Sequence, residues 1–202
     1  QRTKSTRNYR DSFVQWPKSP NQVEFLEKSI MHIRMYRNFL SPETCDSLIE
    51  KFTDSMQNHI KHDAADFYDV DIVKEDWSEV PWLATKFNEL IEIYTQALSL
   101  NTAVQWPAER EWEHFRIKKY NQGKQQFKLH TDDAANRLLA FFVYLNDVQE
   151  GGETDFPIHK ASITPVKGAV LIFPTTWEYL HEGKTPLSED KYILGGYLRG
   201  KE

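Results

Sequence analysis

The chain has 202 residues, enough for one domain with a sizeable buried core. Hydrophobic residues make up 40% and charged residues 27%, which is typical of a globular domain and not of a disordered one. The formal net charge is −5, so no nucleic-acid partner is expected, because phosphate binding depends on Lys and Arg. No stretch approaches the length of apolar chain that crosses a bilayer, so no membrane partner is expected either.

Cys45 is the single cysteine, which rules out a disulfide within the chain and favours a reducing, cytoplasmic location. A lone cysteine can be a nucleophile, but Cys45 falls on the apolar face of a predicted helix, which favours buried packing. Residues 1–10 carry four basic residues and no acidic one. We interpret them as a solvated tail in preference to a binding patch, and no apolar stretch follows that would make them a signal peptide.

The first half of the chain is predicted to be mainly helical. A first strand around residues 32–36 precedes Ser41-Pro42, where Ser suits the N-cap and Pro the first helical position. A second helix is predicted to start near Pro81. Apolar residues recur at helical spacing in the two segments: Cys45, Leu48, Ile49, Phe52 and Met56, then Phe87, Leu90, Ile91, Tyr94 and Leu98. The polar stretch 59–80 is predicted to be a loop, and residues 63–76 are a candidate lid over a site.

From Glu113 the pattern changes to short β-prone runs separated by Gly, Asn, Asp and Pro. The predicted strands are 114–120, 126–129, 138–145, 170–173 and 192–198. Short strands after a helical half predict a single α+β domain. Its helical support would cover about residues 22–110 and its β core about residues 111–202.

The triplet His130-Thr131-Asp132 is the first chemical signal. Residues i and i+2 of an extended strand point to the same face, so imidazole and carboxylate can converge on one metal ion. A second histidine would complete a facial triad and leave positions open for cosubstrate and O₂. Such triplets also occur by chance in solvated turns. His181 is the best candidate for the third ligand, although spacing alone does not separate it from His159.

Lys191 lies ten residues after His181. A lysine inside a pocket can pair with the distal carboxylate of a dicarboxylate cosubstrate. A surface lysine is the ordinary interpretation of any single Lys. The order His-x-Asp, His, Lys favours the cosubstrate role.

The sequence around these residues resembles the catalytic core of prolyl 4-hydroxylase-type Fe(II)/2-oxoglutarate-dependent dioxygenases. The matching stretches are YNQGKQQFKLHTD (120–132), RLLAFFVYLNDVQEGGETDFP (137–157), PVKGAVLIFP (165–174) and HEGKTPLSEDKYILGGYL (181–198). The most specific part is YLND followed by GGETDFP. The resemblance implies a double-stranded β-helix (jelly-roll) core with supporting N-terminal helices. It also implies Fe(II), 2-oxoglutarate as cosubstrate and ascorbate as a supporting reductant.

The resemblance carries over to individual residues. It implies iron ligation by His130, Asp132 and His181, and no further catalytic side chain. Lys191 would bind the distal carboxylate of 2-oxoglutarate, with help from Tyr120 and Thr154. Tyr120 also fits a core tyrosine, and the paired glycines before Thr154 also fit a plain hairpin turn.

Three residues are expected on the substrate side of the pocket. Arg137 matches an arginine of the family there, although a surface charge at a strand edge is an equal alternative. Two positions depart from the family: Tyr197 replaces the usual Trp, and Phe127 replaces a Tyr that many members have. In addition, Glu189-Asp190 replaces a Gly that often precedes the lysine.

The resemblance implies an enzyme that hydroxylates an unactivated C–H bond and produces succinate and CO₂. A proline in a peptide or protein is the expected target, as in procollagen-proline 4-dioxygenases. Two alternatives stay open. One is an oxygenase acting on a free amino acid, another side chain or a methylated nucleobase; the other is a jelly-roll binding module without catalysis.

Overall fold

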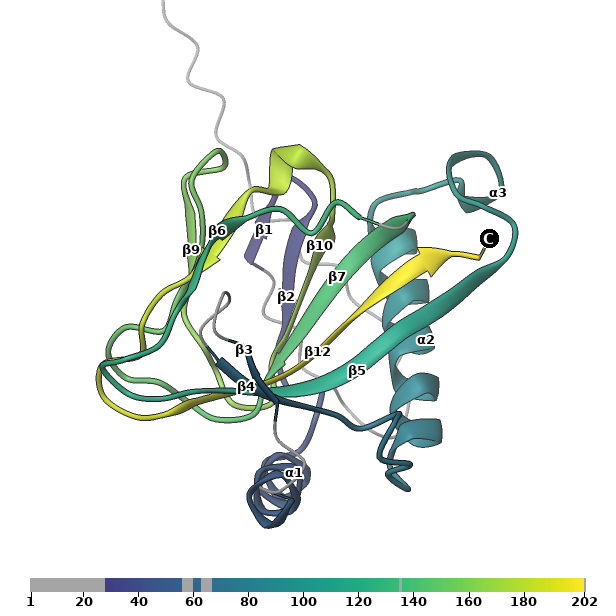
Figure 1. Cartoon of the computed structure of the whole chain (residues 1–202). Coiled ribbons are helices and arrows are strands. Elements are labelled where there is room, and N and C mark those ends of the chain that lie inside the picture. Colours follow the sequence, from purple (N-terminus) through teal and green to yellow (C-terminus); the bar gives the residue numbers. More distant parts are fainter. Residues whose placement is uncertain (1–27, 56–59, 63–66, 135, 202) are drawn as a thin grey trace, which may run out of the picture.

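The computed structural model describes residues 28–55, 60–62, 67–134 and 136–201, without the side chains of residues 28–30 and 62. Two antiparallel sheets face each other, and the helices pack outside the larger sheet (Figure 1). This arrangement confirms the predicted jelly-roll core with supporting helices. The basic tail (residues 1–10) and Met56 lie outside the described residues.

The larger sheet has the strand order β1-β2-β10-β7-β12-β5-β4-β3, and the smaller sheet has the order β6-β11-β8-β9. The larger sheet contains β1 (Lys28–Ile30), β2 (Ile33–Tyr36), β3 (Ile60–His62), β4 (Phe67–Asp71), β5 (Arg110–Tyr120), β7 (Arg137–Tyr144), β10 (Val170–Pro174) and β12 (Lys191–Gly200). The smaller sheet contains β6 (Phe127–His130), β8 (Thr154–Phe156), β9 (Ala161–Ile163) and β11 (His181–Gly183). All five predicted strands of the second half are therefore confirmed, with boundaries shifted by a few residues.

Helices α1 (Pro42–Asp54) and α2 (Val80–Ala97) confirm the two predicted helices. A short α3 (Thr102–Gln105) follows, and a 3-10 turn, η2 (Trp177–Tyr179), precedes β11. The Ser41 hydroxyl accepts a hydrogen bond from the Thr44 amide at 3.2 Å, as expected for an N-cap. Cys45 is buried in the core between the helices and the large sheet, so its predicted packing role is confirmed.

The strands of the large sheet separate two hydrophobic cores by simple alternation. In β7, Phe141 and Val143 face the helices, whereas Phe142 and Tyr144 face the space between the sheets. The same alternation in β5 and β12 turns Tyr120 and Ile193 inward. Inward positions of these three central strands therefore form one wall of the jelly-roll interior.

The prediction of a loop over residues 59–80 is wrong for residues 60–62 and 67–71, because β3 and β4 belong to the large sheet. The two aspartates of β4 pair with basic residues of β5 instead of meeting solvent. The Asp71 carboxylate lies 2.9 Å from the His114 ring, and Asp69 lies 3.7 Å from Arg116. Residues 67–71 therefore cannot form the candidate lid; residues 59 and 63–66 lie outside the described part.

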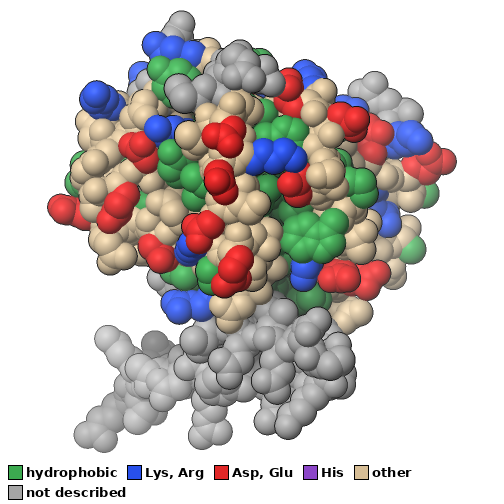
Figure 2. All heavy atoms as spheres, turned by 90° about the horizontal axis from the view of Figure 1, so that it is seen from below, with side chains coloured by type: hydrophobic (Ala, Val, Ile, Leu, Met, Phe, Trp, Pro, Cys, Tyr) green, Lys and Arg blue, Asp and Glu red, His purple; other side chains and the backbone are tan. Residues whose placement is uncertain are grey.

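Acidic and basic side chains are interspersed on the face of the molecule shown in Figure 2. No helix among the described residues is long and apolar enough to cross a membrane.

The junction between α1 and the large sheet depends on Gly168. Its backbone has φ +77°, and its carbonyl accepts hydrogen bonds from the amides of Phe39 and Leu40 at 2.8 and 3.1 Å. A Cβ on Gly168 would collide with the Leu40 carbonyl oxygen. Gly123 has a similar φ of +65°, but a Cβ there would meet nothing within 4 Å.

We therefore expect Gly168→Ala to lower the free energy of unfolding by about 2–4 kcal/mol, because backbone strain and crowding add. Gly123→Ala is the matched control, with a loss of about 1 kcal/mol from backbone strain alone. Urea unfolding monitored by circular dichroism measures both losses. Equal losses in the two variants would contradict this account of the junction.

Candidate functional site

Three residues with metal-binding side chains meet at the mouth of the jelly roll. His130 ends β6, Asp132 follows two residues later, and His181 opens β11. β6 and β11 are antiparallel neighbours in which His130 and His181 are directly paired. One ligand atom from each of the three residues lies within 4.8 Å of the others. It is the one such group among the described residues.

Both imidazoles present the same nitrogen to the centre of this cluster. The Nδ1 of His130 lies 2.6 Å from the Lys128 carbonyl, and the Nδ1 of His181 lies 2.9 Å from the Tyr179 carbonyl. A carbonyl only accepts, so each Nδ1 carries the proton and each Nε2 has a free lone pair. The Nε2 atoms of His130 and His181 lie 3.7 and 3.5 Å from the oxygens of Asp132.

Burial keeps these imidazoles uncharged. It lowers the pKa of His130 and lowers the pKa of His181 to about 4. Within the described part of the chain, the Nε2 atoms of both histidines and Oδ2 of Asp132 are buried without a hydrogen-bond partner. Two lone pairs and a carboxylate oxygen facing one another are costly unless a cation joins them. The residues present therefore fit a divalent metal ion.

The other described histidines do not join this cluster. His159 lies in the turn between β8 and β9, where it is half-buried and packs on the Tyr179 ring with centroids 4.9 Å apart. His114 pairs with Asp71 in the large sheet. The tertiary structure thus brings His181, and not His159, beside Asp132.

A chain of contacts holds the Asp132 carboxylate from behind. The Tyr197 hydroxyl donates to Oδ1 of Asp132 at 3.0 Å. The Arg137 guanidinium lies 3.6 Å from the centre of the Tyr197 ring. Arg137 in turn donates two hydrogen bonds to Glu113, at 2.7 and 2.5 Å. Two of the residues expected on the substrate side, Arg137 and Tyr197, therefore support the Asp132 carboxylate.

Phe127, the third residue expected on the substrate side, packs against His130. The two rings are stacked with centroids 3.7 Å apart. Phe127 also lines the pocket that opens beside the histidines. Its ring therefore fixes the orientation of the imidazole and closes one side of that pocket.

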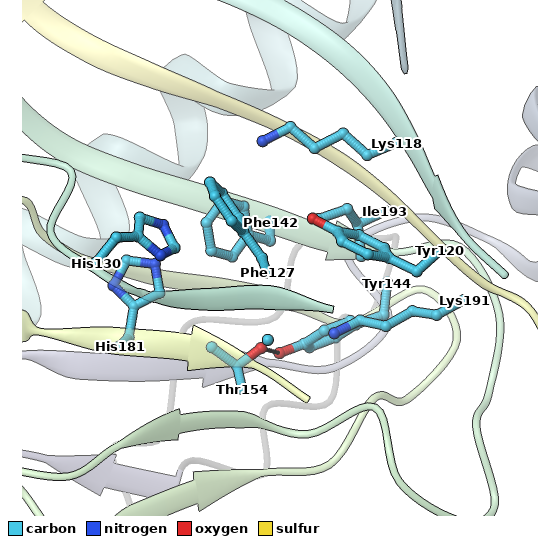
Figure 3. A pocket seen from close by; sticks show the side chains of 11 residues that line it. Lys118, Tyr120, Phe127, His130, Phe142, Tyr144, Thr154, His181, Lys191 and Ile193 are labelled. Carbon is cyan, nitrogen blue, oxygen red and sulfur yellow. Dashed lines mark hydrogen bonds between the residues drawn. The ribbon is translucent and has the colours of Figure 1, made fainter. Parts of the chain in front are cut away.

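A pocket extends from the histidines into the jelly-roll interior (Figure 3). It is lined by Lys118, Tyr120, Phe127, His130, Phe142, Tyr144, Thr154, His181, Gly183, Lys191 and Ile193. The expected residues Lys191, Tyr120 and Thr154 all line it. Tyr144 and Lys118 were not predicted in this pocket, although strand alternation turns both inward: Tyr144 lies two residues after Phe142, and Lys118 lies two before Tyr120.

Lys191 is the deep cation of this pocket. It is 3% exposed, and its Nζ donates to the Gly152 carbonyl at 2.6 Å. Burial lowers the pKa of this lysine to about 7. Lys191 has no ion pair with a carboxylate among the described residues, so an anionic ligand would restore the charge balance.

The glycine pair 151–152 shapes the pocket wall beside the Lys191 ammonium group. Both glycines have positive φ, +73° and +71°, as the GGET turn predicts. This turn leads directly into β8, where Thr154 is buried and its hydroxyl lies 2.9 Å from the Tyr144 hydroxyl. Thr154 and Tyr144 thus place two hydroxyl groups next to the Lys191 ammonium group.

Comparisons with known proteins agree with this geometry. The model of the 2OG-Fe(II) oxygenase superfamily matches residues 115–199, which include all three metal-binding candidates and Lys191. No curated protein sequence matches the chain.

Solved prolyl hydroxylase structures resemble the fold. The collagen prolyl hydroxylase of Paramecium Bursaria Chlorella virus-1, in its 2OG complex, is 23% identical with a TM-score of 0.68, over 85% of this chain and 97% of that one. The Pseudomonas putida prolyl-4-hydroxylase is 17% identical with a TM-score of 0.67, over 85% and 94%. A Trichoplax adhaerens prolyl hydroxylase, in complex with a hypoxia inducible factor peptide fragment, is 15% identical with a TM-score of 0.67, over 83% of each chain.

The resemblance to prolyl 4-hydroxylase-type oxygenases that the motifs predicted is therefore confirmed. The model of the 2OG-Fe(II) oxygenase superfamily matches residues 115–199, and the chain shares its fold with the solved prolyl hydroxylase structures.

Proposed function

We propose that this protein is an Fe(II)- and 2-oxoglutarate-dependent dioxygenase that hydroxylates a proline in a peptide or protein and produces succinate and CO₂. The observation that carries the proposal is the set of partnerless atoms on His130, Asp132 and His181 beside the pocket of Lys191. Peptidyl proline as the target is supported by the similar structures, which are prolyl hydroxylases. Ascorbate is expected to sustain turnover.

His130, Asp132 and His181 would hold the iron through two imidazole Nε2 atoms and one carboxylate oxygen. Three protein ligands leave positions open for the cosubstrate and O₂. When bound, Fe(II) would couple the oxidative decarboxylation of 2-oxoglutarate to hydroxylation of a substrate C–H bond. Carbonyl acceptors at both Nδ1 atoms, and the Tyr197 hydroxyl at the carboxylate, keep the three donor atoms aimed at one point.

Lys191 would pair with the distal carboxylate of 2-oxoglutarate at the deep end of the pocket. The hydroxyl groups of Tyr144 and Thr154 lie beside it and can donate to the same carboxylate. Phe142 and Ile193 line the pocket with apolar side chains. Such walls exclude water and strengthen the interaction between the two charges.

The metal site predicts a clear contrast between two histidine substitutions. We expect His181→Ala to abolish specific Co(II) or Mn(II) binding, because it removes one of three donors. His159→Ala is the matched control, since His159 lies outside the cluster, and should bind as the unmodified chain does. Isothermal titration calorimetry measures both affinities. Undiminished binding by His181→Ala would refute the assignment.

Tyr197 predicts a weaker effect on the same measurement. Tyr197→Phe removes the hydrogen bond to Asp132 and keeps the ring under Arg137, so metal affinity should fall roughly 10-fold. Tyr192→Phe, on the outward face of the same strand, is the control and should leave affinity unchanged. Equal affinity in the two variants would mean that the Tyr197 hydroxyl does not orient the carboxylate.

The pKa of Lys191 predicts a pH dependence of cosubstrate binding. The free protein holds the ammonium form below pH 7 and loses it above, because its pKa is lowered to about 7. Only the ammonium form attracts the carboxylate, so the affinity for 2-oxoglutarate should be constant at lower pH. It should fall by up to about tenfold per unit above pH 7, with proton uptake on binding.

Calorimetry of 2-oxoglutarate binding in buffers of different ionisation enthalpy measures that proton uptake. Lys191→Met should bind 2-oxoglutarate at least about 100-fold more weakly, since a buried charge-assisted bond is lost, and without the dependence on pH. A variant that kept the affinity of the unmodified chain would exclude Lys191 from cosubstrate binding.

The activity itself is tested with purified protein, Fe(II), ascorbate and 2-oxoglutarate. We expect proline-containing peptides to stimulate succinate formation and to gain the mass of one oxygen at proline. Mass spectrometry with ¹⁸O₂ identifies the modified residue. Succinate formation without oxygen transfer to any proline peptide would exclude the peptidyl-proline target, and would leave an oxygenase acting on another substrate.

A further inference from the structure

Lys118 is a second lysine inside the jelly roll that the proposed function does not use. Its side chain is 7% exposed, on the inward face of β5. Its ammonium group lies 4.9 Å from the centre of the Phe67 ring and 5.4 Å from that of Phe127. Its neighbour Lys119 points outward and forms an ion pair with Asp190 at 2.9 Å. Lys119 is thus paired near the surface, whereas Lys118 makes no ion pair with any described residue.

The Lys118 ammonium group has no hydrogen-bond acceptor among the described residues. It carries three N–H donors, and no hydrogen bond from Lys118 Nζ reaches a described residue. Two aromatic rings replace only part of the lost hydration. Desolvation lowers the pKa of Lys118. The carboxylates of Asp132 and Asp69, which lie beyond ion-pairing distance, raise the same pKa by less. A largely buried ammonium group that lines the pocket and has no acceptor among the described residues indicates that a ligand supplies the acceptor.

The position of Lys118 restricts which part of a ligand it can meet. In the pairing of β5 with β12, Tyr120 is opposite Lys191, and Lys118 is opposite Ile193. The Lys118 pair is therefore one inward position further along β12 toward Tyr197. Tyr197 contacts Asp132 of the metal-binding cluster. Figure 3 shows Lys118 and Lys191 on opposite sides of the pocket, with the Lys118 nitrogen directed to the side of His130 and His181. Lys118 therefore serves the metal end of the pocket.

We propose that Lys118 binds a carboxylate group of the ligand that lies against His130, Asp132 and His181. This inference rests on the proposed function and deepens it. The carboxylate has two possible sources: the metal-proximal carboxylate of 2-oxoglutarate, or an acidic side chain of the primary substrate. With Lys191 at the other end, the pocket offers two buried ammonium groups, which match the two carboxylates of 2-oxoglutarate in number and charge.

Ligand binding to the Co(II)-loaded full-length chain tests the first source. The probes are 2-oxoglutarate and 4-oxobutanoate, which keeps the distal carboxylate and lacks the proximal one. Lys118→Met should weaken 2-oxoglutarate at least tenfold and leave 4-oxobutanoate within about twofold, because only the first ligand loses a partner. Lys191→Met should weaken both ligands alike, and Lys119→Met should affect neither. These controls separate failure of the inference from failure of the proposed function.

Peptide kinetics test the second source. Poly-proline and an alternating proline–glutamate peptide are compared in the unmodified chain and in Lys118→Met. In the unmodified chain, the acidic peptide should then have a lower KM than poly-proline. If Lys118→Met removes this difference and leaves the affinity for 2-oxoglutarate unchanged, the carboxylate that Lys118 binds belongs to the substrate.

Thermal unfolding of the metal-free, ligand-free chain gives a readout that does not depend on activity. Since Lys118 is buried without an acceptor, Lys118→Met should unfold at the same or a higher temperature than the unmodified chain. A lower unfolding temperature, combined with unchanged affinity for 2-oxoglutarate and unchanged peptide preference, would overturn the proposal. It would show that Lys118 only balances the charges of Asp132 and Asp69.

Discussion

The buried carboxylate of Asp132 is the constraint on which the site depends. It faces two imidazole nitrogens from one side and the Tyr197 hydroxyl from the other. A buried anion is tolerated only where its neighbours compensate it. The Arg137 guanidinium over the Tyr197 ring supplies a positive charge nearby, and Glu113 holds that guanidinium in place. The cluster of His130, Asp132 and His181 is therefore one end of a network that reaches across the large sheet.

The pocket behind this cluster has the opposite charge. Lys191 and Lys118 are both almost fully buried, and neither makes an ion pair with a described residue. An acidic cluster for a cation and a cationic pocket for an anion thus lie next to each other in one interior. In the ligand-free protein, the ammonium groups of Lys191 and Lys118 are desolvated and have no carboxylate to neutralise them. They therefore lower the stability of that state and favour the binding of an anionic ligand.

Much of the fold was predictable where local patterns were long. The N-cap at Ser41 and the apolar stripes of α1 and α2 predicted both helices, and the long strands β5, β7 and β12 were found from their β-prone runs. The short strands β8, β9 and β11 were missed, since three residues carry no periodicity. β4 was taken for a loop because its aspartates are polar, although they face Arg116 and His114 inside the sheet.

The sequence by itself predicted the type of chemistry, because His-x-Asp, a later histidine, a lysine ten residues on and the GGET turn together carry the resemblance to 2-oxoglutarate oxygenases. Tertiary structure decided which side chains meet. It brought His181 and not His159 to Asp132 through the pairing of β6 with β11. It turned Arg137 and Tyr197 toward the carboxylate, and Lys118 and Tyr144 into the pocket. Strand alternation in the local sequence can show which side chains face inward, but the pairing of strands far apart in the chain decides which of them meet.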